Sequence, residues 1–468
     1  MVLTSSRTTR AVSLFVAVFV LQFLVAVDMS LVNIALPAMA DDLGFTATGL
    51  QWVVNAYLLC FAGFMLLGGR LGDWFGRRRV IVVGLIVFAA ASVIGGLAAA
   101  PWVLVAARAV QGVAAALLAP AALALVTTIS DDTRRKKAMG LWAAAGAAGG
   151  AVGVVASGLL TQWWDWRAVM FVNVPIIVVG LVATWRGVAG HDEHDRSRLD
   201  VLGGVLITAS VTALVFAVTS TDIHGWTSAR TLIALAAATV LCAWFVRTER
   251  KAPLPLMPPR LLATRSILGA NVFGFMLAAG QLAAFYFCSL YVQTVWDVEP
   301  AIAGVLFLPF CGFVVVGIAV SGKLVARFGP RNTIAGLGAL GALGLAVFAR
   351  MPADFDFWLG ILLPSAITAT GIGGSMVLLG VAGTAGVDAR DAGAASGVLN
   401  SSRQLGGTFG LAVLVTIAAR ATLPRDGYQL GLAVGAVFLL VGSVAAWLIL
   451  PRSTEDADVA EAVTTAGI

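Results

Sequence analysis

Asp28 is the residue of this sequence whose type and place point most directly to chemistry. It lies within a long apolar run near the N-terminus, and it is the only one of the 24 Asp and Glu residues that falls deep inside such a run. An ionised carboxylate is costly in an apolar surrounding, so ionisable groups in membrane-spanning segments usually serve a function. We therefore expect Asp28 to bind and release a proton. The alternative is a permanently charged Asp28 that fixes two helices together.

Arg108 is the natural partner for this carboxylate. It is one of two arginines inside apolar runs, the other being Arg403, and Gln111 follows three residues later on the same helical face. An arginine near Asp28 would hold the carboxylate ionised, and separation of the two side chains would release it. We therefore predict that contact between Asp28 and Arg108 links proton binding to conformation.

A small set of polar residues in other apolar runs could line a substrate cavity. They are Gln22, Asn33, Gln111, Gln281, Tyr286, Asn400, Arg403 and Gln404. Contacts between helices explain each of them at least equally well, because polar side chains also join helices in a membrane. Gln281 stands 253 positions after Asp28 and is uncharged, so proton handling is expected in the first half. A cavity with one carboxylate and apolar walls would suit amphipathic compounds.

Several other chemistries lack the residues they need. His191, His194 and His224 all fall between apolar runs, which argues against a histidine proton relay and against a metal site. No phosphate-binding Walker motif is present, so ATP is not the expected energy source. We expect no cofactor, with a proton gradient as the source of energy.

The composition determines which elements must hold these residues. Of 468 residues, 60% are hydrophobic and 12% charged, against about 25% charged in soluble domains. A membrane-spanning helix needs about 20 apolar residues, and unbroken runs of that length exclude a β-barrel. We predict an all-α polytopic membrane protein with spans near 11–31, 51–69, 80–99, 101–126, 138–160, 168–186, 201–219, 230–247, 267–293, 302–320, 332–350, 357–380, 394–418 and 430–450.

The basic residues predict the orientation of these fourteen spans. Most of the 30 Lys and Arg fall in alternate loops, as in the clusters 77–79 and 134–137. Such loops stay in the cytoplasm, so an even number of spans places both termini there. The net charge of +6 then reflects membrane anchoring and gives no reason to expect a nucleic-acid partner.

A repeat divides the chain into two halves. Residues 69–78 recur as residues 322–331 at an offset of 253, each time between the second and third span of a six-span unit. We predict a six-helix bundle over 1–186, a two-helix insertion over 187–266, a second six-helix bundle over 267–450 and a disordered tail over 451–468. Parallel repeats of this kind usually enclose a substrate site near the middle of the membrane.

The motifs resemble those of a known family. Residues 69–79 are similar to the cytoplasmic loop signature of the major facilitator superfamily, and residues 27–37 resemble the first-span signature of its fourteen-span drug:proton antiporters. Matches extend through 104–112, 166–175, 199–203 and 396–407. The resemblance implies proton-coupled export of drugs or antibiotics by alternating access, as a monomer in the bacterial inner membrane, with small molecules, protons and lipid as partners.

The loop signature also has a physical interpretation. Its glycines permit a tight reversal and its charged residues could form a conformational latch, through Gly69, Gly72, Asp73, Gly76 and Arg77. A second interpretation is topological, because the basic cluster keeps the loop inside the cell.

One motif departs from the family pattern. The fifth-span antiporter motif normally ends in Gly-Pro, whereas this sequence has Val154 after Gly153. The remaining glycines, Gly146, Gly149, Gly150 and Gly153, share a helical face and suit close packing at least as well as gating. Export of an endogenous metabolite or nutrient uptake therefore stays open, while an enzyme or a channel is disfavoured by the lack of a catalytic group or a filter repeat.

Overall fold

The computed structural model describes residues 2–127, 129, 131–188, 201–252, 264–383 and 392–451. Every regular element in these ranges is helical. The helices are α1 (Val2–Leu43), α2 (Ala47–Phe75), α3 (Arg77–Gly96), α4 (Pro101–Thr127), α5 (Asp132–Trp163), α6 (Arg167–Phe171), α7 (Asn173–Gly187), α8 (Val201–His224), α9 (Ala229–Lys251), α11 (Arg265–Thr294), α12 (Pro300–Leu306), α13 (Leu308–Phe348), the π-helix η1 (Trp358–Leu362), α14 (Leu363–Ala382), α15 (Ala392–Ala418) and α16 (Pro424–Ile449).

Many of these helices are long and apolar enough to cross a membrane. Eleven stretches of the described residues meet that condition, with mean hydropathies between 1.3 and 2.5. One stretch, residues 300–348, covers two of the predicted spans. The chain is therefore a multi-pass membrane protein by composition and length, and the number of fourteen spans stays a prediction.

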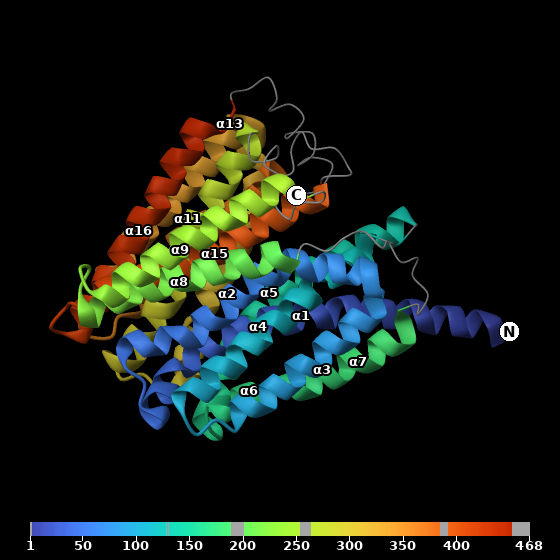
Figure 1. The fold of residues 1–468 in the computed structure, drawn as a ribbon, viewed down its shortest axis with the longest axis horizontal. Coiled ribbons are helices and arrows are strands. Elements are labelled where there is room, and N and C mark those ends of the chain that lie inside the picture. Colours follow the sequence, from blue (N-terminus) through green and yellow to red (C-terminus); the bar gives the residue numbers. More distant parts are fainter. Residues whose placement is uncertain are drawn as a thin grey trace. The chain divides into compact units, whose positions relative to one another are not determined.

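The chain divides into two compact units by its internal contacts. The first comprises Met1–Val205 with Glu299–Val305, and the second comprises Leu206–Val298 with Leu306–Ile468. In the first unit α1 packs against α4, α5 and α7, while α4 also packs against α2 and α3 (Figure 1). In the second unit α11 packs against α15 and α16, and α13 packs against α14 and α16. Most of the buried positions of α1 are apolar, among them Leu21, Leu24 and Leu31, each fully buried.

The two copies of the repeat adopt matching backbone conformations. Gly76 separates α2 from α3 with φ of 89°, and Gly329, 253 positions later, bends α13 with φ of 75°. Both angles lie where a side chain would be strained, so each reversal requires glycine.

An arginine two residues after each of these glycines packs on a tryptophan of its own unit. The guanidinium of Arg78 lies 5.9 Å from the Trp185 ring centre, and that of Arg331 lies 4.7 Å from the Trp447 ring centre. Trp185 is near the end of α7 and Trp447 near the end of α16, the last helix of each bundle. The repeat is therefore visible in tertiary contacts as well as in sequence.

Several helix boundaries differ from the predicted spans. The spans expected at 302–320 and 332–350 lie on either side of Gly329, whose non-helical backbone divides α13 into two helical segments. The first of these spans begins in the short helix α12. The span expected at 168–186 is interrupted at Val172, between α6 and α7. The first helix begins before and ends after the predicted span 11–31, and it continues through Pro37. Of the predicted tail over 451–468, all but the first residue lie outside the described residues, as do His191 and His194.

Candidate functional site

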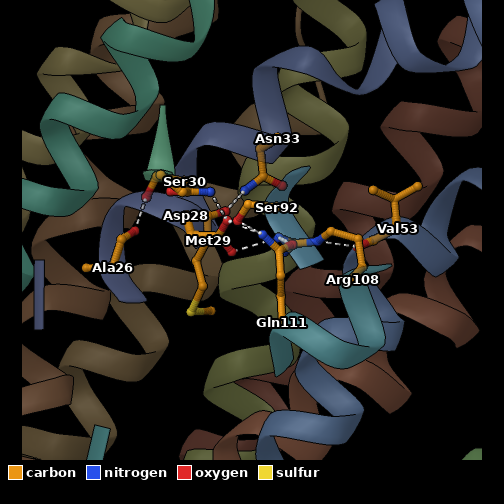
Figure 2. Close-up of polar contacts among 10 residues, drawn as sticks. Ala26, Asp28, Met29, Ser30, Asn33, Val53, Ser92, Arg108 and Gln111 are labelled. Atoms are coloured by element: carbon orange, nitrogen blue, oxygen red, sulfur yellow. Dashed lines mark hydrogen bonds and ion pairs between the residues drawn. The ribbon is translucent and has the colours of Figure 1, made fainter. Parts of the chain in front are cut away.

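Asp28 lies at the centre of a buried polar cluster in the first unit (Figure 2). Its Oδ2 atom is 2.7 Å from Nη1 of Arg108, and the side chains of Asp28 and Arg108 are 0% and 2% exposed. The contact expected from sequence is present, between residues 80 positions apart. Charge-assisted hydrogen bonds of this kind are shorter and stronger than those between neutral groups.

Arg108 has further partners on α2 and α4. Its Nη1 atom also donates to Oε1 of Gln111 at 2.8 Å, and its Nε atom donates to the backbone oxygen of Val53 at 3.1 Å (Figure 2). The guanidinium carbon lies 4.4 Å from the ring centre of Tyr57, a cation–π contact. These contacts hold the arginine in place independently of Asp28.

The second oxygen of Asp28 faces uncharged donors. Asn173, the first residue of α7, donates through Nδ2 to Oδ1 of Asp28 at 2.8 Å. Nε2 of Gln111 lies 3.5 Å from the same oxygen and donates to Oγ of Ser92 at 2.8 Å. Four helices besides α1 thus contribute to the cluster: α2, α3, α4 and α7.

Sequence reasoning missed three members of this cluster. Ser92, Tyr57 and Asn173 lie in apolar runs without a pattern that sets them apart, and Asn173 appeared only as part of the motif at 166–175. The spacing between Asn173 and Asp28, 145 positions, cannot be read from any local period. The motif itself was the available signal.

That motif joins α1 at two points. Oδ2 of Asp42, near the end of α1, accepts from Nε1 of Trp166 at 3.1 Å and pairs with Nη2 of Arg167 at 2.8 Å. The same Nη2 atom of Arg167 also donates to the backbone oxygen of Ala98 at 3.2 Å. The start of α6 is therefore tied to α1, and the start of α7 reaches the carboxylate of Asp28.

The glycine face of α5 packs closely against the part of α1 that carries Asp28. A Cβ atom at Gly149 would lie 2.8 Å from Cβ of Ala26. A Cβ atom at Gly153 would lie 2.8 Å from Cβ of Ser30 and also 2.8 Å from the backbone oxygen of Val27. Gly146 and Gly150 leave more room, at 3.2 Å from Nε2 of Gln22 and 3.9 Å from Oγ of Ser30. Ser157, one turn further, donates to the backbone oxygen of Leu31. These contacts give the α5 glycines a definite packing role in this conformation.

The predicted latch residues surround the reversal between α2 and α3. Nη1 of Arg77 donates to the backbone oxygen of Ala124 on α4 at 3.0 Å. A Cβ atom at Gly69 would lie 3.6 Å from Cβ of Pro120, and one at Gly72 would lie 3.8 Å from Cγ of Arg77. The side chain of Asp73 is outside the described residues. Arg77 therefore attaches the loop to α4 within the first unit.

The candidate cavity residues are distributed over both units. In the first unit, Asn33 is 7% exposed and its Nδ2 atom donates to the Met29 oxygen of its own helix at 2.9 Å (Figure 2). In the second, Nδ2 of Asn400 donates to the Ser396 oxygen of its own helix, and Tyr286 is 2% exposed. Gln281, Arg403 and Gln404 are half-buried on α11 and α15. Among the described contacts, Gln111 is the one candidate cavity residue that hydrogen-bonds to members of the Asp28 cluster.

Comparison with known proteins decides the family. The family model for the Major Facilitator Superfamily matches residues 18–411. The chain belongs to this superfamily. It is therefore a transporter of this superfamily and not an enzyme.

Proteins named for a role in export or resistance are similar to this chain over most of its length. The cephamycin export protein CmcT of Amycolatopsis lactamdurans is 40% identical, covering 89% of this chain and 87% of its own length. The puromycin resistance protein pur8 of Streptomyces alboniger is 36% identical, covering 95% and 92%. A crystal structure of the peptide transporter POT in complex with sulfate has the same fold, with a TM-score of 0.69 at 17% identity, and covers 95% of this chain and 94% of its own.

Proposed function

We propose that this protein is a proton-coupled exporter of drugs or antibiotics of the fourteen-span drug:proton antiporter family. The observation that carries this proposal is the buried ion pair between Arg108 of α4 and Asp28 of α1, the helix whose sequence resembles the first-span signature of that family. Relatives named for cephamycin export and for puromycin and lincomycin resistance support antibiotics as the substrate class.

The geometry supports a proton step at Asp28. Breaking a buried ion pair by removing one partner costs about 3–5 kcal/mol when the other charge is left without compensation. Protonation of Asp28 would leave Arg108 bound to Oε1 of Gln111, the Val53 oxygen and the face of Tyr57. These contacts would lower the cost of losing the carboxylate charge, so the cluster can accept a proton while the arginine stays solvated by protein groups.

In the proposed cycle, Asp28 takes up a proton from outside and the protein reopens to the cytoplasm. Substrate binding there accompanies proton release, after which Asp28 pairs again with Arg108. We further propose that the protein lies in the bacterial inner membrane as a monomer with both termini in the cytoplasm, and that the Gly69–Arg79 loop favours one conformation. Gln22, Asn33, Gln281, Tyr286, Asn400, Arg403 and Gln404 remain candidates for substrate contact.

Uptake into inside-out vesicles tests the proposal. Puromycin and lincomycin would serve as probes for wild type and Asp28→Asn, each with and without an uncoupler. We expect uptake by wild type that the uncoupler abolishes and that is lost in Asp28→Asn. Asp165→Asn is the matched control, because Asp165 contacts Arg167 at the surface of the same unit.

Two results would change the proposal. Gradient-driven uptake that survives in Asp28→Asn would restrict the Asp28–Arg108 pair to a structural role. Accumulation in right-side-out vesicles instead would favour nutrient uptake, the alternative that Val154 in place of the motif's proline keeps open.

A further inference from the structure

We propose that Asn173 is a positioning residue that serves both protonation states of Asp28, donating a hydrogen bond to the carboxylate and accepting one from the carboxylic acid. This inference rests on the proposed function, because it requires that Asp28 takes up a proton. It assigns a role to the amide at the start of α7.

In the structure the amide acts as a donor. Nδ2 of Asn173 lies 2.8 Å from Oδ1 of Asp28, and the side chain of Asn173 is fully buried. Together with Arg108 and Gln111, it surrounds Asp28 with hydrogen-bond donors. An ionised carboxylate accepts such bonds and has none to give, so this arrangement fits the anion.

A protonated Asp28 needs an acceptor instead. Most oxygens of the cluster already have a donor: Oε1 of Gln111 accepts from Arg108, Oγ of Ser92 accepts from Gln111, and the Val53 oxygen accepts from Arg108. The Oδ1 atom of Asn173 is buried and has no hydrogen-bond partner among the described residues. A buried acceptor without a partner is costly, so the ionised state leaves this amide half satisfied.

A half turn of the terminal amide would exchange the two roles. Because Nδ2 and Oδ1 are related by rotation about the Cβ–Cγ bond, the turn would place Oδ1 near the position that Nδ2 now occupies beside Asp28. The O–H of the acid would then donate to Oδ1 and satisfy it. The hydroxyl oxygen of Tyr57 is also buried without a partner, but no hydrogen bond joins it to Asp28 among the described contacts.

The backbone of Asn173 is held while the amide turns. Trp166 and Arg167 lie seven and six residues before Asn173 on the same short segment. Both side chains bind Asp42, and Arg167 also binds the Ala98 oxygen.

The charged or titratable side chains that face Asp28 in the described cluster are Arg108 from α4 and Tyr57 from α2. The contributions of α3 and α7 are the uncharged Ser92 and Asn173, and α5 presents its glycine face. Asn173 is thus the neutral group best placed to follow the proton.

Infrared difference spectroscopy over a pH titration tests this assignment without a transport substrate. The full chain would be reconstituted in vesicles of phosphatidylethanolamine and phosphatidylglycerol, and the carboxylic acid band that Asp28→Asn removes would be assigned to Asp28. The test variants are Asn173→Leu, which removes both donor and acceptor, and Asn173→Asp, which keeps the acceptors and replaces the donor by a like charge. Asn55→Leu is the matched control, because Asn55 is a buried amide of α2 whose described contact is with Gln51.

We expect two changes in Asn173→Leu. The midpoint of the Asp28 titration should rise by about one pH unit, a tenfold change in proton affinity, because a bond to a charged group is worth more than one to its neutral form. The acid band should also move toward the frequency of a carboxylic acid without a hydrogen-bond acceptor. In Asn173→Asp the midpoint should rise further, since two adjacent carboxylates share a proton, while the band keeps the position of a hydrogen-bonded acid.

Each other outcome overturns the inference in a recognisable way. A raised midpoint with an unmoved band in Asn173→Leu would make Asn173 a donor to the anion only. An unchanged midpoint, or an equal change in Asn55→Leu, would remove any specific role. If no acid band disappears in Asp28→Asn, Asp28 takes up no proton and the proposed function itself fails.

Discussion

Among single residues, the energetics of the Asp28–Arg108 pair follow from its burial. Arg108→Ala would leave an uncompensated carboxylate, and we expect a loss of about 3–5 kcal/mol in the free energy of unfolding at neutral pH. The double variant Asp28→Asn with Arg108→Ala should lose less than the sum of the two single changes, since no charge remains unpaired. Equilibrium unfolding in mixed micelles measures all four forms. Additive effects in this cycle would contradict a coupled pair.

Two substitutions at Tyr57 can distinguish what its ring and its hydroxyl each contribute to stability. Its ring lies under the Arg108 guanidinium, while its hydroxyl is buried without a partner. Tyr57→Phe keeps the cation–π contact and removes an unsatisfied group, so stability should stay equal or rise. Tyr57→Leu should cost about 1–2 kcal/mol for a contact shielded from water. The same unfolding assay compares the two, and equal losses would show that the ring contact contributes nothing.

For whole helices, the approach of α5 to α1 sets what each glycine tolerates. We expect Gly149→Ala and Gly153→Ala to lose about 1–3 kcal/mol, because a Cβ atom at either position would lie 2.8 Å from atoms of α1. Gly150→Ala is the matched control on the same face, with its nearest atom 3.9 Å away, and should gain up to about 1 kcal/mol of helix propensity.

Thermal unfolding in detergent would rank these three variants. Equal unfolding temperatures for the three variants would show that α1 and α5 separate easily in detergent, and the packing interpretation of this motif would fail. A normal stability with lost transport in Gly150→Ala would instead support a gating role for the glycine face.

In the molecule as a whole, the two units repeat one plan with unequal chemistry. The reversal at Gly76 and the bend at Gly329 match, and so do the Arg78–Trp185 and Arg331–Trp447 contacts. Of these features, the buried ion pair is the one that the second unit does not repeat, because the uncharged Gln281 stands at the position that matches Asp28. The shared plan is thus structural, while the ionisable group is specific to one unit.

The topology of the chain has a direct test. With fourteen spans and both termini in the cytoplasm, a C-terminal green fluorescent protein fusion should fluoresce and a C-terminal alkaline phosphatase fusion should be inactive. A phosphatase fusion after Gly225, between α8 and α9, should be active because seven spans precede it. An active C-terminal phosphatase would indicate an odd number of spans.

The sequence alone determined the class of protein, the repeat and the two charged residues of the site. Apolar length and charge are local properties, so a charge inside an apolar run is visible wherever it occurs. The motifs added the superfamily, which the comparisons confirm.

Tertiary structure decided which groups surround Asp28. Asn173 and Arg108 reach it from 145 and 80 positions away, and Ser92 and Tyr57 join through side chains that no helical period sets apart from ordinary core residues. It also decided that α6 and α7 are separate helices. Such features depend on how helices pack against one another, and the order of residues along one helix does not contain that information.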